Sequence, residues 1–320
     1  MDPLVLPQLV AGLIYLLGGA DFLVRGSVAL ARRMRVSPVF VAISVVAVGT
    51  SLPELVVTVR ATATGHPGLI LGNVVGSNIA NVLLVGGAAA AVAPVRLSGG
   101  NTRRTSTSMM AGSLLFAGLC LSGALTPGNG ALLLAALTVI LAITTKAAIE
   151  AQQAEDDATP LDWVLGIPSR LPTIVLLIVL GVLALPLGAD YLVRSSVEIA
   201  ALLGVSETVI GLSIVAIGTS MPEVATAVVA ARQRRPLMVV GTIIGSNTFN
   251  VLGVMGVTAV ISAEPVGVTS RFLSLDLPVM VGVSALLTLC AWLRLSIGRG
   301  VGLALVAGYA AYLVALYMTV

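Results

Sequence analysis

The chain has 320 residues, of which 58% are hydrophobic and 10% charged, with a mean hydropathy of +1.08 and a formal net charge of +3. Soluble domains are about 25% charged, and a soluble protein of this composition would expose apolar surface everywhere, so the composition indicates a membrane protein. The pI near 9.2 does not indicate a nucleic-acid partner, because the basic residues cluster at the ends of apolar segments. Cys120 and Cys290 lie alone in apolar runs, which predicts buried hydrophobic side chains rather than a disulfide or a metal pair.

Apolar runs long enough to cross a bilayer, which takes about 20 residues, follow one another along the whole chain. The first run has no basic segment before it and is too long for a signal peptide, so we predict that it is the first spanning helix. Cutting the chain at its charged and Gly/Pro/Asn clusters predicts ten spanning helices, at 6–31, 36–63, 67–93, 106–125, 129–149, 171–200, 205–231, 236–262, 275–293 and 298–319.

The basic residues give these helices a direction. If alternate loops share a side, 13 of the 17 Lys and Arg residues fall on one side. The positive-inside rule makes that side cytoplasmic, which predicts a multi-pass protein of the inner (plasma) membrane with both termini outside. The longest polar segment, residues 150–170, contains four acidic residues between 155 and 162 and is predicted to be an acidic cytoplasmic linker.

An internal repeat relates the two halves of the chain. Residues 46–87 align without a gap with residues 215–256, and 19 of 42 positions are identical. The repeating unit extends upstream, so residues 1–149 and 171–320 are predicted to be two five-helix repeats. Because five is odd, the second copy crosses the membrane in the opposite direction, an arrangement typical of secondary transporters with a midplane substrate site. The predicted fold is therefore an all-α membrane protein with ten transmembrane helices in two inverted five-helix repeats.

Glu54 and Glu223 occupy equivalent positions deep in apolar runs of the two repeats. A carboxylate in the hydrocarbon costs at least ~2.5 kcal/mol, which makes an intramembrane acid a candidate functional residue. The alternative is a structural ion pair, for which Arg60 is the nearest partner of Glu54. The counterpart of Arg60 in the second repeat is a valine, so pairing does not explain both acids.

The residues before each glutamate are also repeated. A Thr lies four positions before the acid, on the same helix face, a Ser three positions before it, and a Pro directly before it. Since proline cannot donate to the carbonyl four residues earlier, the helix is predicted to break there, which lipid tolerates only where the break lines a polar cavity. These residues are Thr50, Ser51 and Pro53 in the first repeat and Thr219, Ser220 and Pro222 in the second. The helical turns that the prolines are predicted to loosen include Ala47 and Ala216.

The next predicted helix of each repeat adds a Ser and an Asn four residues apart, Ser77 and Asn81 in the first and Ser246 and Asn250 in the second. Together with the glutamates they form an all-oxygen set, which suits a hard cation such as Ca²⁺. The only histidine, His66, lies in a short loop, so a zinc, copper or iron site is not indicated.

The paired motifs Gly-Thr-Ser-x-Pro-Glu, each followed by Gly-Ser-Asn, resemble the two alpha repeats of the calcium/cation antiporter superfamily, in particular its prokaryotic sodium/calcium exchanger branch. The resemblance covers essentially the whole chain. It implies that Ca²⁺ is held by Glu54, Glu223 and the carbonyls of Thr50 and Thr219, and that Na⁺ uses Ala47, Ser51, Ser77, Ala216, Ser220 and Ser246 around the same carboxylates. It also implies exchange of three Na⁺ for one Ca²⁺ by alternating access, with the first and sixth helices sliding against the core.

One departure from the family concerns Asn81 and Asn250. Potassium-dependent members often have Asp at the second of these positions, whereas both are neutral here, which predicts exchange that does not require K⁺. The sequence thus predicts a Na⁺/Ca²⁺ antiporter in a lipid bilayer, with no enzymatic activity, cofactor or obligatory protein partner.

Three other interpretations compete with this one. A H⁺/Ca²⁺ antiporter of the same superfamily carries a Gly-Asn-x-x-Glu motif, which is absent around Glu54 and Glu223. A cation channel usually forms a ring of ligands from several subunits, whereas this chain has two inverted single-copy sites. A membrane scaffold without transport gives no reason for two matched buried acids.

Overall fold

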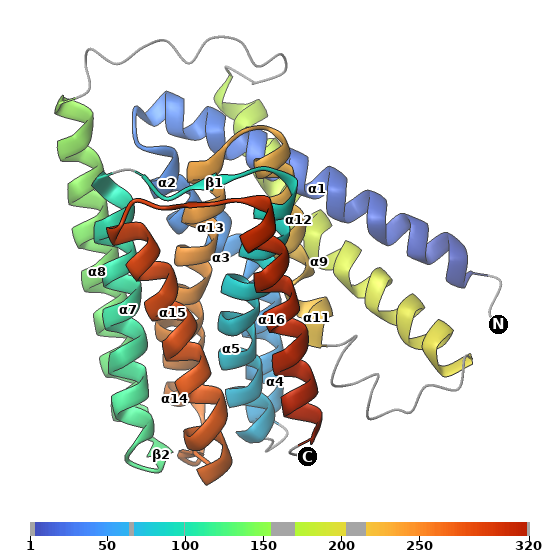
Figure 1. The fold of residues 1–320 in the computed structure, drawn as a ribbon, viewed down its shortest axis with the longest axis vertical. Coiled ribbons are helices and arrows are strands. Elements are labelled where there is room, and N and C mark those ends of the chain that lie inside the picture. The colour runs from blue at the N-terminus through green and yellow to red at the C-terminus, as the bar shows by residue number, and fades with distance from the viewer. Residues whose placement is uncertain (1–3, 64–66, 99, 155–169, 203–215, 319–320) are drawn as a thin grey trace.

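The structure is a computed structural model, and it describes residues 4–63, 67–98, 100–154, 170–202 and 216–318. Within these residues the protein is a bundle of long helices, with two short ribbons at its ends (Figure 1). Only the start and the last residue of the predicted linker, 150–170, belong to the described residues, and its four acidic residues between 155 and 162 lie outside them.

In both halves of the chain some spanning helices are divided into shorter segments. The first half contains α1 (Val5–Met34), α2 (Pro38–Val41), η1 (Ala42–Val46), α3 (Ala47–Thr50), α4 (Leu52–Ala63), α5 (Pro67–Ala80), η2 (Asn81–Val85), α6 (Gly86–Val92), β1 (Val95–Arg96), α7 (Gly100–Cys120), β2 (Ala124–Leu125) and α8 (Pro127–Ala154). The second half contains α9 (Leu171–Leu202), α11 (Ala216–Thr219), α12 (Met221–Arg232), α13 (Pro236–Thr248), η4 (Phe249–Val254), α14 (Met255–Ile261), β3 (Val266–Gly267), η5 (Phe272–Asp276), α15 (Leu277–Trp292), β4 (Ser296–Ile297) and α16 (Arg299–Met318).

The all-α membrane fold is confirmed, whereas the predicted count of ten spans is not. Among the described residues, seven helices are long and apolar enough to cross a membrane, and the bent pair formed by residues 38–50 and 52–63 makes eight. The predicted span at 106–125 corresponds to α7, whose first turns are polar and carry Arg103 and Arg104. The predicted span at 205–231 begins outside the described residues, which include only its α11 and α12.

The two ribbons relate the halves in opposite directions. β1 and β3 are counterparts, because β1 directly follows the divided span α5–η2–α6 and β3 directly follows the equivalent span α13–η4–α14. β1 pairs with β4, whereas β3 pairs with β2. Because β1 and β2 lie at opposite ends of α7 (Figure 1), the counterparts β1 and β3 also lie at opposite ends of the bundle. This is the geometry that inverted repeats require.

Helices α1 and α9 pack against each other along most of their length, beside the upright bundle (Figure 1). A seam of glycines spaced seven residues apart allows this contact. A Cβ added at Gly181 would lie 2.7 Å from the carbonyl oxygen of Gly19, and one added at Gly188 would lie 2.8 Å from that of Gly12. The two backbones are therefore too close for any side chain at these positions.

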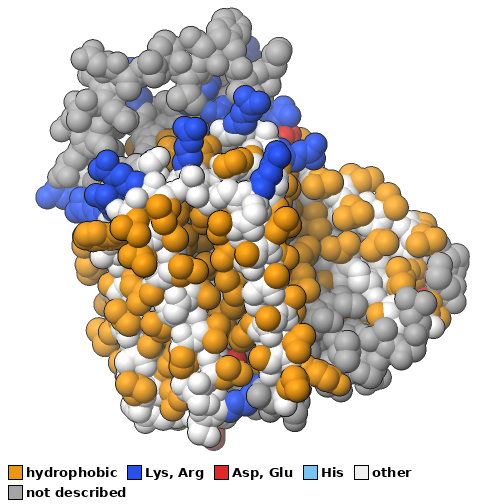
Figure 2. All heavy atoms as spheres, in the orientation of Figure 1, with side chains coloured by type: hydrophobic (Ala, Val, Ile, Leu, Met, Phe, Trp, Pro, Cys, Tyr) orange, Lys and Arg blue, Asp and Glu red, His pale blue; other side chains and the backbone are white. Residues whose placement is uncertain are grey.

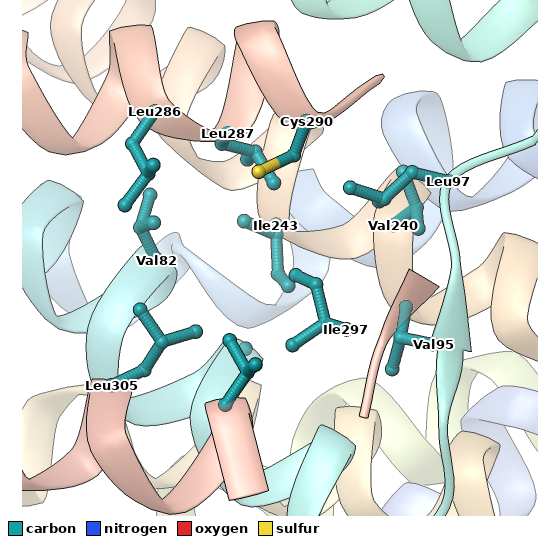
Figure 3. Close-up of a pocket in the computed structure, with 12 residues that line it drawn as sticks. Val82, Val95, Leu97, Val240, Ile243, Leu286, Leu287, Cys290, Ile297 and Leu305 are labelled. Carbon is teal, nitrogen blue, oxygen red and sulfur yellow. The ribbon is translucent and has the colours of Figure 1, made fainter. Parts of the chain in front are cut away.

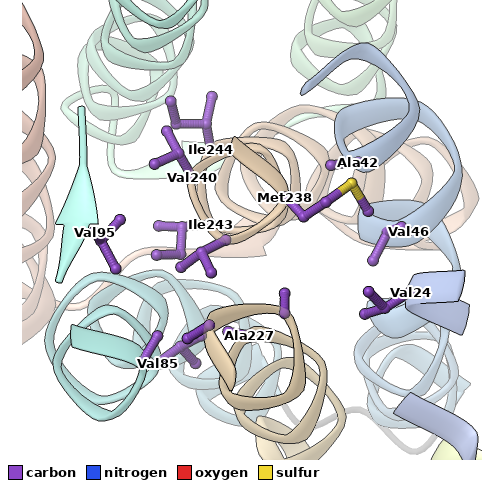
Figure 4. Packing of buried hydrophobic residues seen from close by; sticks show 14 of the residues in the cluster. Val24, Ala42, Val46, Val85, Val95, Ala227, Met238, Val240, Ile243 and Ile244 are labelled. Atoms are coloured by element: carbon purple, nitrogen blue, oxygen red, sulfur yellow. The ribbon is translucent and has the colours of Figure 1, made fainter. Parts of the chain in front are cut away.

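The centre of the bundle is α13. Its side chains, among them Met238, Val240, Ile243 and Ile244, point outward into neighbouring helices in all directions (Figure 4). In the most apolar 18-residue stretch of the segment from Pro236 to Ile261, 89% of the residues are buried, although the segment is apolar enough to face lipid. A central helix of this kind holds its polar residues away from the hydrocarbon.

Candidate cation-binding site

The two helices that carry the buried glutamates are broken at the same place. Ser51 leaves the helical conformation (φ −89°, ψ 7°), and the segments before and after it are bent by 43°. Ser220 has nearly the same backbone angles (φ −89°, ψ 3°). Both breaks lie two residues before a proline, at Pro53 and Pro222, as the sequence predicts.

The neighbouring helices contain π-helical turns that the sequence did not predict. The turn η2 begins at Asn81, and η4 contains Asn250 in the equivalent position. Such turns insert one extra residue per turn into an α-helix and occur mostly at functional sites. Hydrophobic periodicity gives no signal for a single wide turn, whereas the repeated Asn marks both positions.

Both glutamates are buried, with exposed fractions of 1% for Glu54 and 0% for Glu223. Within the described part of the chain neither forms an ion pair, and the side chain of Arg60 is exposed, which contradicts the alternative of a structural salt bridge. One oxygen of Glu223 accepts a hydrogen bond from Ser51 at 3.2 Å, while Glu54 faces Ser77 without a hydrogen bond of good geometry. Three carboxylate oxygens are therefore available as ligands.

The site is built from both halves. The hydroxyl of Ser51, in the first half, donates to Glu223 in the second, and the Thr50 and Ser246 hydroxyls lie 3.5 Å apart across the same boundary. Glu54 and Glu223 are close enough to repel each other electrostatically. Two like charges out of water are stable only if a cation or protons neutralise them.

The two asparagines of the site are also buried, Asn81 at 1% and Asn250 at 0% exposed. Neither their amide nitrogens nor their amide oxygens have a hydrogen-bond partner among the described residues. Buried polar atoms without a partner are uncommon and costly, so these amides are suited to bind an ion or a water.

The other residues predicted for the site lie on the same breaks. Ala47 is buried and its carbonyl accepts from Thr50 at 3.3 Å, and Ser220 is buried with no partner for its hydroxyl among the described residues. Thr219 is half-buried. The backbone of Ala216 begins α11, but its side chain lies outside the described residues.

A second pair of asparagines, absent from the predicted site, joins the halves. The amide nitrogen of Asn247 donates to the carbonyl of its own repeat counterpart, Asn78, at 3.3 Å, and both side chains are fully buried. The repeated Gly-Ser-Asn motif was the available signal for these residues.

A cavity of about 360 Å³ reaches the site from one end of the bundle. Ser77 and Thr219 line it, together with residues of α4, η5 and the second half of α16. That part of α16 lies at the end away from β1 and β4 (Figure 1). Within the described residues no group of three or more His, Cys, Asp or Glu side chains could hold a metal ion, and the buried acids are the two glutamates.

Comparison with known proteins gives similarity over almost the whole chain. The protein family described as sodium/calcium exchanger protein matches residues 4–146 and 173–318. The chain is 33% identical to inner membrane protein YrbG of Escherichia coli, over 97% of this chain and 95% of that protein. It is 30% identical to the sodium/calcium exchanger MaX1 of Methanosarcina acetivorans, over 97% of each. A structure of the sodium-calcium exchanger NCX_Mj, soaked without Na⁺ and Ca²⁺, superposes with a TM-score of 0.84 at 29% identity, covering 99% of this chain and 100% of that one.

Proposed function

Because the chain belongs to the sodium/calcium exchanger family, we propose that it exchanges Na⁺ for Ca²⁺ across the membrane as a secondary antiporter. The observation that carries the proposal is the pair of buried carboxylates, Glu54 and Glu223, which no described basic residue neutralises. MaX1 and NCX_Mj, to which the chain is similar, are both named as sodium/calcium exchangers.

In the proposed site Ca²⁺ binds between Glu54 and Glu223, with the carbonyls of Thr50 and Thr219 as further ligands. Oxygen ligands of this kind suit Ca²⁺, and two carboxylates balance its charge. Sodium ions use the same carboxylates with the surrounding Ser and Ala positions, so that the two cations compete. Asn81 and Asn250 contribute neutral oxygens to the centre of the site.

This charge distribution supports a stoichiometry of three Na⁺ per Ca²⁺ and independence from K⁺. Ca²⁺ leaves the two ionised glutamates formally neutral, whereas three Na⁺ give a charge of about +1. Glu54 and Glu223 are the only buried carboxylates among the described residues, so no third buried acid supports binding of K⁺.

The cavity at Ser77 and Thr219 supports a proposal for the direction of access. The arginine-rich loops lie at the opposite end, around β1 and β4, and the positive-inside rule makes that end cytoplasmic. We therefore place both termini outside and interpret this conformation as open to the external face, with access alternating when α1 and α9 slide.

The experiment that tests the function is ⁴⁵Ca²⁺ uptake into proteoliposomes containing the purified protein. Vesicles loaded with Na⁺ and diluted into Na⁺-free medium are expected to take up Ca²⁺, and vesicles with only a pH gradient are not. Uptake driven by the pH gradient alone would instead support H⁺/Ca²⁺ exchange. The exposed Glu264 provides a control, because Glu264→Gln removes a carboxylate outside the site.

A further inference from the structure

Four arginines surround the short ribbon that joins the two halves at one end of the bundle. Arg96 lies in β1, while Arg294 and Arg299 stand two residues before and after β4. Arg103 donates to the carbonyl of Trp292 at 2.7 Å, and its guanidinium lies 6.0 Å from the centre of the indole ring. Figure 2 shows the Lys and Arg side chains along the upper rim, directly above a hydrophobic face.

These arginines have no acidic partner among the described residues. Arg299 contacts the backbone carbonyl of Val92 at 3.4 Å, and Arg103 contacts that of Trp292. Membrane topology requires basic residues on this side of the bilayer, but it does not require four of them around one two-residue ribbon. The cluster therefore offers unneutralised charge to an anion.

An apolar cavity of about 70 Å³ lies next to this cluster, between α15 and α16 (Figure 3). Val95 and Ile297 line the part of the cavity next to the ribbon, and Leu286 and Val301, also in its lining, are 46% and 55% exposed. Helix α15 packs mainly on α7, and α16 mainly on α6, so that a groove between them faces the lipid. The cavity is too small for a whole acyl chain and accommodates a short stretch of one.

We propose that this groove binds an anionic phospholipid, with its phosphate on Arg96 and Arg299 and the upper part of one acyl chain along Leu286 and Val301. Guanidinium groups bind phosphate oxygens in a bidentate manner, and basic pockets between transmembrane helices on the cytoplasmic side recognise anionic lipid headgroups. Trp292, 55% exposed beside the cluster, has the position of an interfacial aromatic anchor.

The floor of the groove connects this lipid with the cation site. Val82 follows Asn81 in η2, and Ile243 lies three residues before Ser246 on α13. A chain in the groove would contact the discontinuous helices that carry the candidate ion ligands, and would thereby support the wide turn η2.

Trp292 provides a direct probe of lipid binding. The chain has two tryptophans, and the other, Trp163, lies outside the described residues. In a Trp163→Phe variant, reconstituted in phosphatidylcholine vesicles, Trp292 fluorescence is measured as dibrominated phosphatidylglycerol or dibrominated phosphatidylcholine replaces the unlabelled lipid. Each arginine near an anionic headgroup is worth about five-fold in affinity, so half-maximal quenching is expected at a mole fraction at least about five-fold lower for phosphatidylglycerol.

Two double variants distinguish lipid binding at this site from a general attraction of anionic lipid to basic residues. The Arg96→Gln/Arg299→Gln variant should lose the preference for phosphatidylglycerol, whereas Arg33→Gln/Arg35→Gln, which removes the same charge at the end of α1, should keep it. Equal quenching by the two lipids in the parent protein, or equal loss in both double variants, would overturn the proposal. Reversal of the quenching by millimolar inorganic phosphate would also overturn it, because the site would then bind a free anion.

Discussion

The contact between α1 and α9 makes a quantitative prediction for Gly181→Ala. The added Cβ would lie 2.7 Å from the carbonyl oxygen of Gly19 and 2.8 Å from the backbone nitrogen of Leu23, whereas ordinary contacts begin at 3.4 Å. The helices would have to separate by about 0.7 Å, and overpacking of this kind costs ~1–3 kcal/mol. Gly18→Ala is a matched control, since nothing lies within 4 Å of its added Cβ. That change should stabilise the helix by up to ~1 kcal/mol.

The assay is thermal unfolding of the purified variants in detergent, followed by Na⁺-driven ⁴⁵Ca²⁺ uptake. Gly181→Ala should unfold at a lower temperature than the parent protein, and Gly18→Ala at the same or a higher temperature. If α1 and α9 move together against the bundle, Gly181→Ala should also slow uptake. Equal unfolding temperatures for the two alanine variants would show that the helices are not in the close contact described.

Four other predictions concern the cation site. Glu54→Gln and Glu223→Gln should each abolish Ca²⁺ uptake in a folded protein, because Ca²⁺ needs both carboxylates, whereas Glu264→Gln should transport normally; uptake by either site variant would remove that residue from the site. Ca²⁺ affinity should fall as the pH drops, since protons compete for the same carboxylate oxygens, and a constant affinity between about pH 5 and pH 8 would contradict this. Replacing all K⁺ by choline should leave Na⁺-dependent uptake unchanged, and a strict K⁺ requirement would refute the charge argument. Exchange of three Na⁺ for one Ca²⁺ should respond to voltage, because one charge moved through 100 mV is worth ~2.3 kcal/mol; an equilibrium Ca²⁺ ratio independent of voltage would indicate electroneutral exchange.

The sequence predicted those parts of the fold that depend on composition and covalent geometry. The apolar composition indicated the membrane, and Pro53 and Pro222 marked the helix breaks because proline lacks a backbone donor. The repeat predicted an inverted arrangement, and the counterpart strands β1 and β3 lie in different ribbons.

Other features depend on tertiary packing, which hydrophobic periodicity does not report. The π turns at Asn81 and Asn250 arise where a helix widens within the packed core, and periodicity does not distinguish such a turn from an ordinary one. The bond between Asn247 and Asn78 joins residues 169 positions apart, so it required the arrangement of the two halves. The span at 106–125 was placed too late in the chain, because α7 begins at Gly100, within a polar stretch.

Equilibrium binding of ⁴⁵Ca²⁺ to the purified protein, with increasing Na⁺, tests most directly whether both cations share the two buried carboxylates. We predict that Na⁺ displaces Ca²⁺ completely, with a Hill coefficient above about 1 because several Na⁺ replace one Ca²⁺, and that Glu54→Gln and Glu223→Gln remove the binding. Ca²⁺ binding that persists at saturating Na⁺, or that survives in the Glu54→Gln/Glu223→Gln double variant, would contradict the assignment of these carboxylates as the exchange site.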